Sequence, residues 1–252
     1  MVAAVALLVG TRVGADDKLN AREIVDKVVD ADPFGMMDSK ISGRAVLHDK
    51  HNDERILEFR ADSLRYKPGL SKAITRFSKP ADIAGVGFLQ IMREDADDDR
   101  FLYLPELKKS RRIAGALRNN SFMGTDLSYA DLDMRDLRES KATLTGTEKI
   151  GKFTYYKVDV VPTRGDSIYS KFELWVRSDN FLVLKWLMYD KSNVLLKTYQ
   201  ASEMKRVEGH WYANKGRIEN HREKHTTDLY LDDMKPAAVS ESEFTVGNLE
   251  KL

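Results

Sequence analysis

Residues 171–189 have the sequence KFELWVRSDNFLVLKWLMY, and this stretch decides the fold class. A turn cluster, SDN at 178–180, separates two segments in which apolar side chains recur at every second position. Because successive side chains of a β-strand point to opposite faces, this period of two predicts a hairpin with one apolar face. The apolar positions are Phe172, Leu174 and Val176 in the first strand, and Leu182, Leu184, Trp186 and Met188 in the second.

The same pattern continues on both sides of this hairpin. The further apolar positions are Tyr156, Val158 and Val160 before it, and Val194 and Leu196 after it. Strands are expected near 41–49, 54–61, 73–79, 85–92, 100–104, 142–149, 153–161, 171–177, 181–189, 193–200, 211–220 and 225–232. No helical pattern of about 10 to 15 residues separates the strands of the C-terminal half, which excludes parallel βαβ units there. The sequence therefore predicts a mainly β (α+β) chain built on an antiparallel meander.

Two segments outside the strands are expected to cover the apolar face. Residues 20–23, NARE, form a capping box, and the apolar stripe at 19, 24, 25, 28 and 29 predicts a short amphipathic helix over 20–31. Residues 106–138 interrupt the meander with little strand character, and their apolar content favours a lid over a linker. In this lid, Gly115 and Gly124 are the expected hinges. The expected plug residues are Ile113, Leu117, Phe122 and Met123.

Two short covers over a broad curved sheet imply an apolar cleft beneath them. We expect the alternating apolar side chains between 156 and 196 to line this cleft and to bind the ligand. An ordinary sandwich core without a cavity is the alternative, and the sequence leaves it open.

The first fifteen residues differ from the rest of the chain. Residues 1–10, MVAAVALLVG, are an apolar run too short to span a bilayer, for which about 20 residues are needed. The run is typical of a secretory signal peptide, with Val13 and Ala15 as the small residues before the cleavage site. A buried N-terminal helix or strand is the alternative. We expect a signal peptide at 1–15 and a single exported domain at 16–252 that carries the lid insertion at about 106–138.

Composition and motifs exclude several classes of function. The 252 residues contain no cysteine, and 41 basic residues balance 40 acidic ones. This excludes a disulfide scaffold, and nucleic acid is not an expected partner because no excess of basic residues is available to bind phosphates. The sequence has no G-x-S-x-G elbow, no P-loop and no dinucleotide-binding fingerprint. We therefore expect neither an enzyme nor a bound cofactor.

Two motifs resemble metal sites but lack the required order of ligands. Between His221 and His225 the glutamate is not adjacent to the first histidine, as it is in H-E-x-x-H. We interpret this segment as a strand followed by a turn with two exposed histidines. The acidic run from Asp95 to Asp99 lacks the glycine and the distal glutamate of an EF-hand loop, which indicates a solvated hairpin turn. No metal site is expected.

The central segment, residues 87–132, carries motifs of a known family. These are FLYLP at 101–105, KSRRI at 109–113 and SFMGTD at 121–126, followed by Tyr129 and by Asp131 and Leu132. Together with the opening helix, AREIVDKVVDAD at 21–32, they resemble the outer-membrane lipoprotein-sorting protein family, whose members have a LolA/LolB-like fold. The resemblance covers most of the chain after residue 15.

This resemblance implies a half-open antiparallel β-barrel of about 11–12 strands, with short helices covering its concave face. It further implies a soluble, monomeric periplasmic carrier that binds the acyl chains of a lipid or lipoprotein and delivers its ligand towards the outer membrane. An RND-type exporter in the inner membrane and an acceptor at the outer membrane are the partners it suggests. An envelope-stress sensor or protein-interaction module that uses the same concave face is the alternative.

Basic residues within the family motif are the expected contacts to a lipid headgroup or an acidic partner. They are Lys109, Arg111 and Arg112, and arginine in particular suits bidentate contacts to phosphate or carboxylate. A charged outer face of the lid is the alternative. The resemblance also implies an arginine that locks the lid, for which Arg111 and Arg112 are the candidates.

Overall fold

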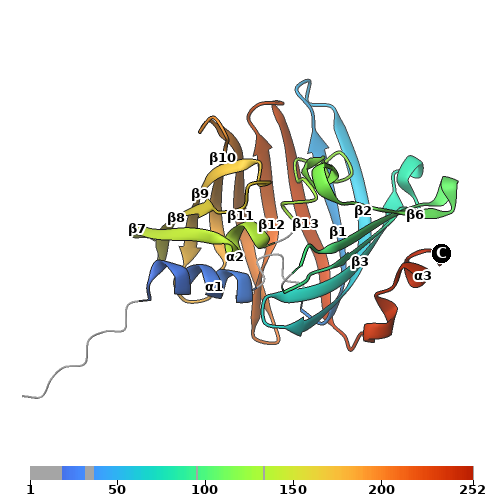
Figure 1. Cartoon of the computed structure of the whole chain (residues 1–252), viewed down its shortest axis with the longest axis horizontal. Coiled ribbons are helices and arrows are strands. Elements are labelled where there is room, and N and C mark those ends of the chain that lie inside the picture. Colours follow the sequence, from blue (N-terminus) through green and yellow to red (C-terminus); the bar gives the residue numbers. More distant parts are fainter. Residues whose placement is uncertain (1–18, 32–36, 95, 133, 252) are drawn as a thin grey trace, which may run out of the picture.

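The computed structural model describes residues 19–31, 37–94, 96–132 and 134–251. The expected signal peptide at 1–15 lies outside the described residues. Figure 1 shows a strongly curved sheet, with short helices and loops on its concave side.

Thirteen strands in the described residues form this one antiparallel sheet. They are β1 (Ser39–His48), β2 (Glu54–Lys67), β3 (Leu70–Lys79), β4 (Gly87–Ile91), β5 (Asp99–Leu104), β6 (Lys109–Arg112), β7 (Ser140–Ile150), β8 (Phe153–Pro162), β9 (Tyr169–Arg177), β10 (Val183–Asp190), β11 (Leu195–Val207), β12 (His210–Asn220) and β13 (His225–Pro236). The helices are α1 (Ala21–Ala31), α2 (Arg135–Arg138) and α3 (Val246–Leu249), and the 3-10 turns are η1 (Ala81–Ile83), η2 (Pro105–Leu107), η3 (Gly115–Asn119) and η4 (Glu241–Glu243).

The predicted mainly β, half-open antiparallel fold is confirmed, and a strand is present at each of the expected places. The additional strand is β6, which lies inside the segment predicted to be a lid and pairs with β5. Its sequence, KSRR, has no apolar alternation because three of its four side chains are exposed at the edge of the sheet. The part of the insertion that leaves the sheet therefore begins at residue 113, and residues 113–138 are called the lid from here on.

The strand order explains where the lid lies. Strands β1 to β6 form one meander and β7 to β13 form another, and the two meanders are joined by the pairing of β1 with β13. The free edges of the sheet are consequently β6 and β7, which are consecutive in the sequence. The connection between them has to pass from one edge of the sheet to the other, and it does so over the concave side (Figure 1). The lid is thus a consequence of the topology.

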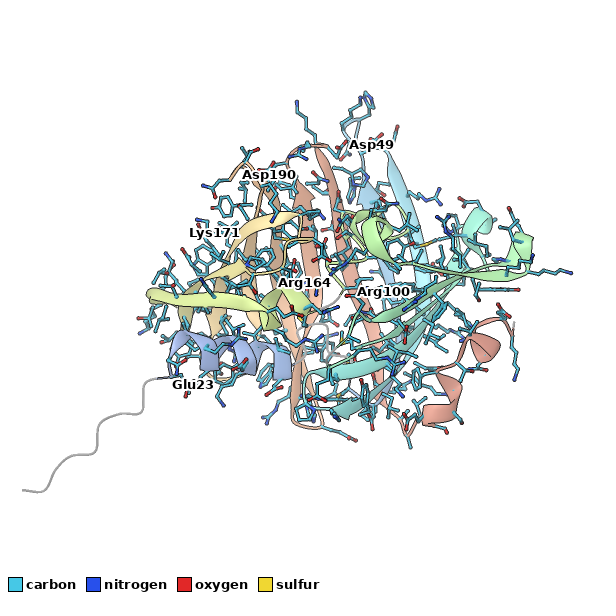
Figure 2. The ribbon with its side chains drawn as sticks, in the orientation of Figure 1. Glu23, Asp49, Arg100, Arg164, Lys171 and Asp190 are labelled. Atoms are coloured by element: carbon cyan, nitrogen blue, oxygen red, sulfur yellow. The ribbon has the colours of Figure 1, made fainter. Side chains whose placement is uncertain are left out.

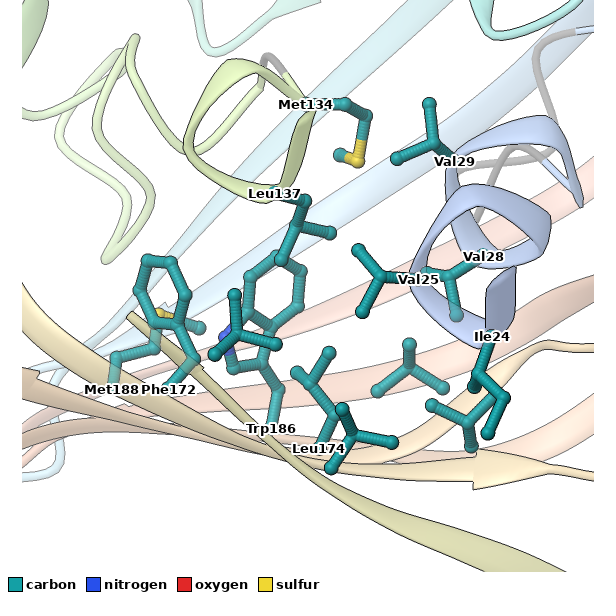
Figure 3. Close-up of a cluster of buried hydrophobic side chains, with 14 of the residues drawn as sticks. Ile24, Val25, Val28, Val29, Met134, Leu137, Phe172, Leu174, Trp186 and Met188 are labelled. Carbon is teal, nitrogen blue, oxygen red and sulfur yellow. The ribbon is translucent and has the colours of Figure 1, made fainter. Parts of the chain in front are cut away.

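The first helix covers one half of the concave face. Its start is the predicted capping box, in which the Asn20 backbone amide donates to the Glu23 carboxylate at 2.7 Å and the Glu23 amide donates to the Asn20 side chain at 3.0 Å. Ile24, Val25 and Val28 are completely buried against side chains of β8, β9 and β10 (Figure 3). The half of the sheet formed by β7 to β10 is therefore closed by a packed helix.

The C-terminal segment covers part of the opposite, convex face. Phe244 and Leu249 are buried against Ile74 and Leu89, which alternate with cavity-facing residues on β3 and β4. Both faces of these two strands are consequently apolar. Figure 1 shows α3 on this side of the sheet, next to the C-terminus.

A close approach between strands makes Gly43 the more sensitive of two buried glycines. A Cβ atom at Gly43 would lie 2.5 Å from the backbone oxygen of Tyr230, which cannot move without distorting β13. At Gly87 it would lie 2.7 Å from the end of the flexible Leu249 side chain. We expect Gly43→Ala to lower the free energy of unfolding by about 1 to 3 kcal/mol and Gly87→Ala by clearly less, as measured by urea denaturation. Equal losses would contradict this reading of the β1–β13 contact.

Candidate ligand-binding site

An apolar cavity of about 140 Å³ lies between the lid and the strands on the concave side. The strands contribute Ile41, Ala45, Leu57, Ala61, Ala73, Phe77, Ala213 and Leu229, among others, and the lid contributes Phe122, Thr125, Leu127 and Leu132. Four of these strand positions are alanines, whose small side chains leave space at the centre of an apolar face. A cavity of about 150 Å³ accepts a benzene ring. A small apolar group fits here, whereas an acyl chain requires the lid side chains to move.

Phe122 closes this cavity from the lid side. Its ring lies 5.9 Å from that of Phe77, 5.0 Å from that of Phe88 and 5.4 Å from that of Tyr129, measured between centroids. The turn that presents the ring is tight, because Gly124 has a φ of +82° and the Phe122 carbonyl accepts the amide of Thr125 at 3.0 Å. Glycine adopts such a positive φ without steric cost. The aromatic plug is thus positioned by a short glycine-containing turn.

The other three predicted plug residues lie around Phe122. Ile113 is buried with Phe88 and Tyr129, and Leu117 packs against the same cluster. Met123 points to the outer rim, where it lines an open hollow together with Leu47 and His225. Of the four, it is Phe122 that lines the apolar cavity.

A buried carboxylate attaches the lid to β13. Asp126 is 5% exposed, and its side chain accepts a hydrogen bond from the Thr227 hydroxyl at 2.7 Å and lies 2.8 Å from Nδ1 of His225. In return, the Asp126 backbone amide donates to the Thr227 hydroxyl at 3.0 Å. A buried carboxylate is stable only when it is hydrogen-bonded or paired. The sequence did not predict this attachment. The interpretation of His225 as an exposed side chain is wrong, because His225 is half-buried and forms a hydrogen bond with Asp126 of the lid.

A second buried anchor connects the lid to β9 and β11. The Asp131 carboxylate accepts a hydrogen bond from the Lys197 ammonium at 2.7 Å and another from the Tyr169 hydroxyl at 2.6 Å. The side chains of Asp131 and Lys197 are each less than one-tenth exposed. Burial, and then the adjacent Asp131 carboxylate, raise the pKa of Tyr169 well above its ordinary value. The phenol therefore remains protonated and donates to Asp131. With Asp126, this anchor holds residues 126–131 of the lid to β9, β11 and β13.

A second, smaller cavity of about 40 Å³ lies beside this anchor. Its lining includes Asp131 and Asp136 from the lid, and Tyr169, Phe172, Trp186 and Met188 from β9 and β10. Leu127 and Tyr199 line both cavities. The two spaces are therefore neighbours, one apolar and one with polar groups in its wall.

The residues predicted to bind the ligand divide into groups. Phe172, Trp186 and Met188 line the smaller cavity. Six others pack into the core cluster beneath α1: Val158, Val160, Leu174, Val176 and Leu196 are buried there, and Tyr156 is partly buried. Alternation alone does not distinguish a strand face covered by a helix from one that faces a cavity.

The remaining three predicted lining residues lie outside both cavities and outside this core cluster. Val194 is 59% exposed because it follows the turn at 190–193 and precedes β11. Leu184 lies at a bulge, where Val183 pairs with Val176 and Lys185 with Trp175, so the strict alternation is broken at this point. Leu182 is buried but precedes β10. The bulge brings Val183, rather than Leu184, to the cavity.

The predicted headgroup contacts lie at the edge of the sheet. Lys109, Arg111 and Arg112 are exposed on β6, and none of them lines either cavity in the described part of the chain. Arg112 pairs with Asp99 at 2.9 Å. Charged side chains on an edge strand disfavour pairing with another chain, which gives these residues a structural role.

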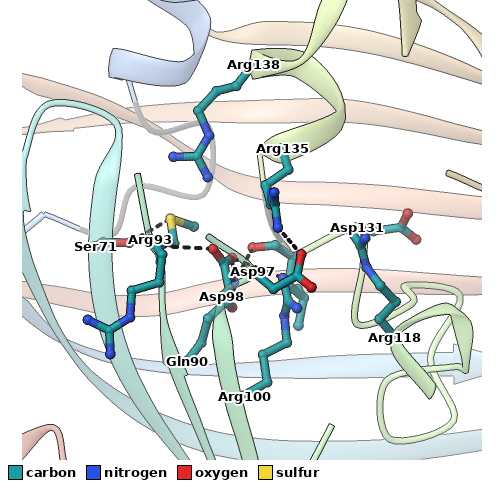
Figure 4. Close-up of polar contacts among 12 residues, drawn as sticks. Ser71, Gln90, Arg93, Asp97, Asp98, Arg100, Arg118, Asp131, Arg135 and Arg138 are labelled. Atoms are coloured by element: carbon teal, nitrogen blue, oxygen red, sulfur yellow. Dashed lines mark hydrogen bonds and ion pairs between the residues drawn. The ribbon is translucent and has the colours of Figure 1, made fainter. Parts of the chain in front are cut away.

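The acidic run at 95–99 was predicted to be a solvated turn, and for Asp98 this is wrong. Asp98 and Arg100 are each 3% exposed and form an ion pair at 3.0 Å (Figure 4). Gln90, which lines the larger cavity, donates to the backbone oxygen of Leu132 at 3.1 Å. Figure 2 shows Arg100 near the centre of the molecule, whereas Lys171 lies at its periphery. The same Gln90 amide donates to Asp98 at 3.4 Å, so Asp98 belongs to a buried polar cluster that contacts the lid.

Comparison with solved structures gives close matches over nearly the whole chain. A domain from Vibrio parahaemolyticus, described as outer membrane lipoprotein-sorting, has a TM-score of 0.84 and 26% sequence identity, and the match covers 92% of this chain and 98% of that one. A DUF1329 family protein from Desulfovibrio piger has a TM-score of 0.82 and 26% identity over 90% of this chain and 97% of that one. A LolA superfamily protein from Nitrosomonas europaea shares the fold, with a TM-score of 0.70 at 19% identity over 90% and 98% of the two chains.

A family model with the description "-like: Uncharacterized protein" matches residues 69–251, which is more than half of the chain. The chain belongs to the family that this model describes, and it is similar over nearly its whole length to the outer membrane lipoprotein-sorting domain and to the DUF1329 family protein. The predicted resemblance to this LolA-like family is thereby confirmed. No curated protein matches the sequence. Among the described helices of this family member, none is both long and apolar enough to cross a membrane.

Proposed function

We propose that this protein is a periplasmic carrier that binds an acyl chain of a lipid or lipoprotein in the larger cavity and delivers it towards the outer membrane. The observation that carries the proposal is an apolar cavity closed by a lid that buried hydrogen bonds hold in place. Each methylene transferred from water contributes about 0.8 kcal/mol, so a chain of 16 carbons contributes more than about 10 kcal/mol before ordering costs.

The family supports the class of ligand and the compartment. A related domain is described as outer membrane lipoprotein-sorting, and it covers 92% of this chain. We further propose that residues 1–15 direct export and that residues 16–252 form the carrier domain. An RND-type exporter in the inner membrane supplies the ligand in this scheme, and an acceptor at the outer membrane receives it.

Filling the cavity tests the proposal directly. Ala73 lies on β3, is 6% exposed and lines the larger cavity, whereas Ala81 lies in η1 and is exposed. We expect Ala73→Phe to reduce binding of the neutral probe diphenylhexatriene by more than about tenfold, because the new ring occupies the space of the ligand. Ala81→Phe adds the same ring outside the cavity and should leave the affinity within about twofold of the wild type.

Binding is measured by the increase in probe fluorescence, and circular dichroism verifies that both variants are folded. Equal affinities of the two variants, or no binding by the wild-type protein, would contradict a carrier that uses this cavity. Mass spectrometry of lipids extracted from the protein purified out of its native envelope then identifies the bound class.

A further inference from the structure

The hairpin formed by β5 and β6 ends in an exposed apolar side chain. Leu107 lies in the 3-10 turn η2 between the two strands, and it is 63% exposed, the largest fraction among the exposed large apolar side chains of the described residues. Pro105 begins this turn, and the Lys108 backbone amide closes it by donating to the Pro105 oxygen at 3.1 Å. A hydrogen-bonded turn therefore holds Leu107 in the solvent.

Basic residues follow Leu107 directly. Residues 104–112, LPELKKSRR, contain four basic residues and one acidic residue, whereas the whole chain has 41 basic and 40 acidic residues. Arg112 pairs with Asp99 at 2.9 Å. The other three basic residues are exposed and have no ion pair in the part of the chain that the structure describes: Lys108, Lys109 and Arg111. Residues 107–111, called the basic tip from here on, thus combine an apolar side chain with three unpaired cations.

The backbone of β6 is poorly suited to bind a further strand. Strand addition needs a row of free amides and carbonyls along a sheet edge. The Ser110 backbone amide is already occupied, because it donates to the Glu250 carboxylate of the C-terminal segment at 3.0 Å. β6 is also only four residues long. The groups that remain available to a partner are therefore the side chains of the basic tip.

An anionic membrane surface matches these side chains. Lipid phosphates accept hydrogen bonds from ammonium and guanidinium groups, and each Lys or Arg near an anionic surface strengthens binding by about fivefold. A neighbouring apolar side chain enters the boundary between headgroups and acyl chains. Reversible membrane binding generally combines both signals, since one of them alone is weak.

We propose that the basic tip docks this protein on a membrane surface that contains anionic phospholipid. Leu107 enters the interface, and Lys108, Lys109 and Arg111 contact the phosphates. Figure 1 shows this hairpin at the end of the molecule opposite β7, so the tip reaches a flat surface before the rest of the sheet does. Because β6 leads directly into the lid at residue 113, docking places the start of the lid at the membrane. The inference goes beyond the carrier function and does not depend on the cavity.

The first experiment removes the three unpaired charges. Cosedimentation measures binding to vesicles of phosphatidylcholine with about 30% phosphatidylglycerol, and to vesicles of phosphatidylcholine alone. The test variant combines Lys108→Gln, Lys109→Gln and Arg111→Gln. The control variant changes the net charge by the same amount at exposed lysines elsewhere on the sheet: Lys149→Gln, Lys152→Gln and Lys205→Gln.

We expect the wild-type protein to bind the mixed vesicles and not the uncharged ones. The test variant should lose more than about thirtyfold in affinity, and the control variant should stay within about threefold of the wild type. Raising the salt from about 50 to about 500 mM should abolish binding, because the shorter Debye length screens the phosphates. Circular dichroism verifies that both variants are folded.

The second experiment asks whether Leu107 enters the interface. The chain has no cysteine, so Leu107→Cys accepts a single environment-sensitive label such as nitrobenzoxadiazole. Its emission should shift to the blue on mixed vesicles. The matched control is Val194→Cys, because Val194 is 59% exposed in the turn between β10 and β11, and its label should keep the emission it has in water.

Each result bears on the inference separately from the proposed function. If the wild-type protein leaves the mixed vesicles unbound, as it would with an acidic protein as partner, or binds both kinds of vesicle equally, membrane docking is wrong. If the two charge variants bind alike, or the label at residue 107 stays in water, the basic tip is not the docking surface. Diphenylhexatriene binding, measured without vesicles, should be the same in both charge variants. Its absence from the wild-type protein would overturn the carrier function and leave the docking surface intact.

Discussion

We expect the Trp186→Asp chain not to fold, whereas Trp175→Asp gives a folded protein. Trp186 packs edge-on to Phe172, with ring centroids 5.3 Å apart, inside the cluster that α1 covers (Figure 3). Loss of a buried tryptophan costs about 3 to 5 kcal/mol. An unpaired carboxylate in the same place adds several kcal/mol. The sum reaches the whole stability of an ordinary domain, about 5 to 15 kcal/mol.

Trp175 is a matched control because it lies on the neighbouring strand and the opposite face. Lys157 and Lys185 lie over its ring at 5.1 and 5.0 Å from the centroid, so an aspartate there gains two cationic neighbours. Circular dichroism and urea denaturation of the two variants measure the difference. A folded Trp186→Asp protein with a stability within about 1 kcal/mol of Trp175→Asp would show that this face is not the buried one.

The double variant Phe122→Ala with Met123→Ala is expected to bind acyl ligands more tightly and to release them more slowly. Phe122 occupies the boundary of the cavity, so ligand and plug compete for the same apolar surface. If the plug stabilises the closed state by about 2 kcal/mol, its removal raises the open fraction by up to about thirtyfold. Apparent affinity rises in proportion to that fraction while the open state is the minor one.

Affinity and stability are expected to change in opposite directions in this variant, and that makes the gate testable. Phe244→Ala is the control, because Phe244 is 4% exposed but packs on the convex face, away from both cavities. It should lower the urea midpoint without changing ligand affinity. If the lid variant instead loses affinity together with stability, Phe122 and Met123 belong to a static core and the gate is refuted. Stopped-flow transfer to acceptor vesicles measures the release rate.

The sequence by itself determined the strands and the start of the helix. Period-two alternation is a local property of the backbone, so the hairpin at 171–189 and its apolar face follow from the order of the residues. The same holds for the capping box at residues 20–23, whose two hydrogen bonds join residues three apart. Family motifs in residues 87–132 added the half-open topology, which local patterns do not contain.

The location of the cavity was decided by the tertiary structure. Val158 and Leu174 have the same alternating pattern as Leu57 and Ala61, yet the first pair lies beneath α1 and the second lines the larger cavity. The sequence contains one indication of the cavity, namely the alanines at 45, 61, 73 and 213, whose small side chains leave space on an apolar face. These alanines indicate a cavity only once the pairing of β1 with β13 is known, because that pairing brings the four positions together.

The long-range polar contacts of the lid likewise could not be predicted from the sequence. Asp126 meets Thr227 and His225 about 100 residues later, and Asp131 meets Lys197. Nothing in the spacing of these residues indicates a contact, because it depends on β6 and β7 being the two free edges of one sheet. That topology carries the lid across the concave face, where each polar side chain must find a partner or remain unpaired in an apolar surrounding. The sequence determined which segments are strands and which face of each is apolar, and the pairing of distant strands decided which of those faces surround a cavity.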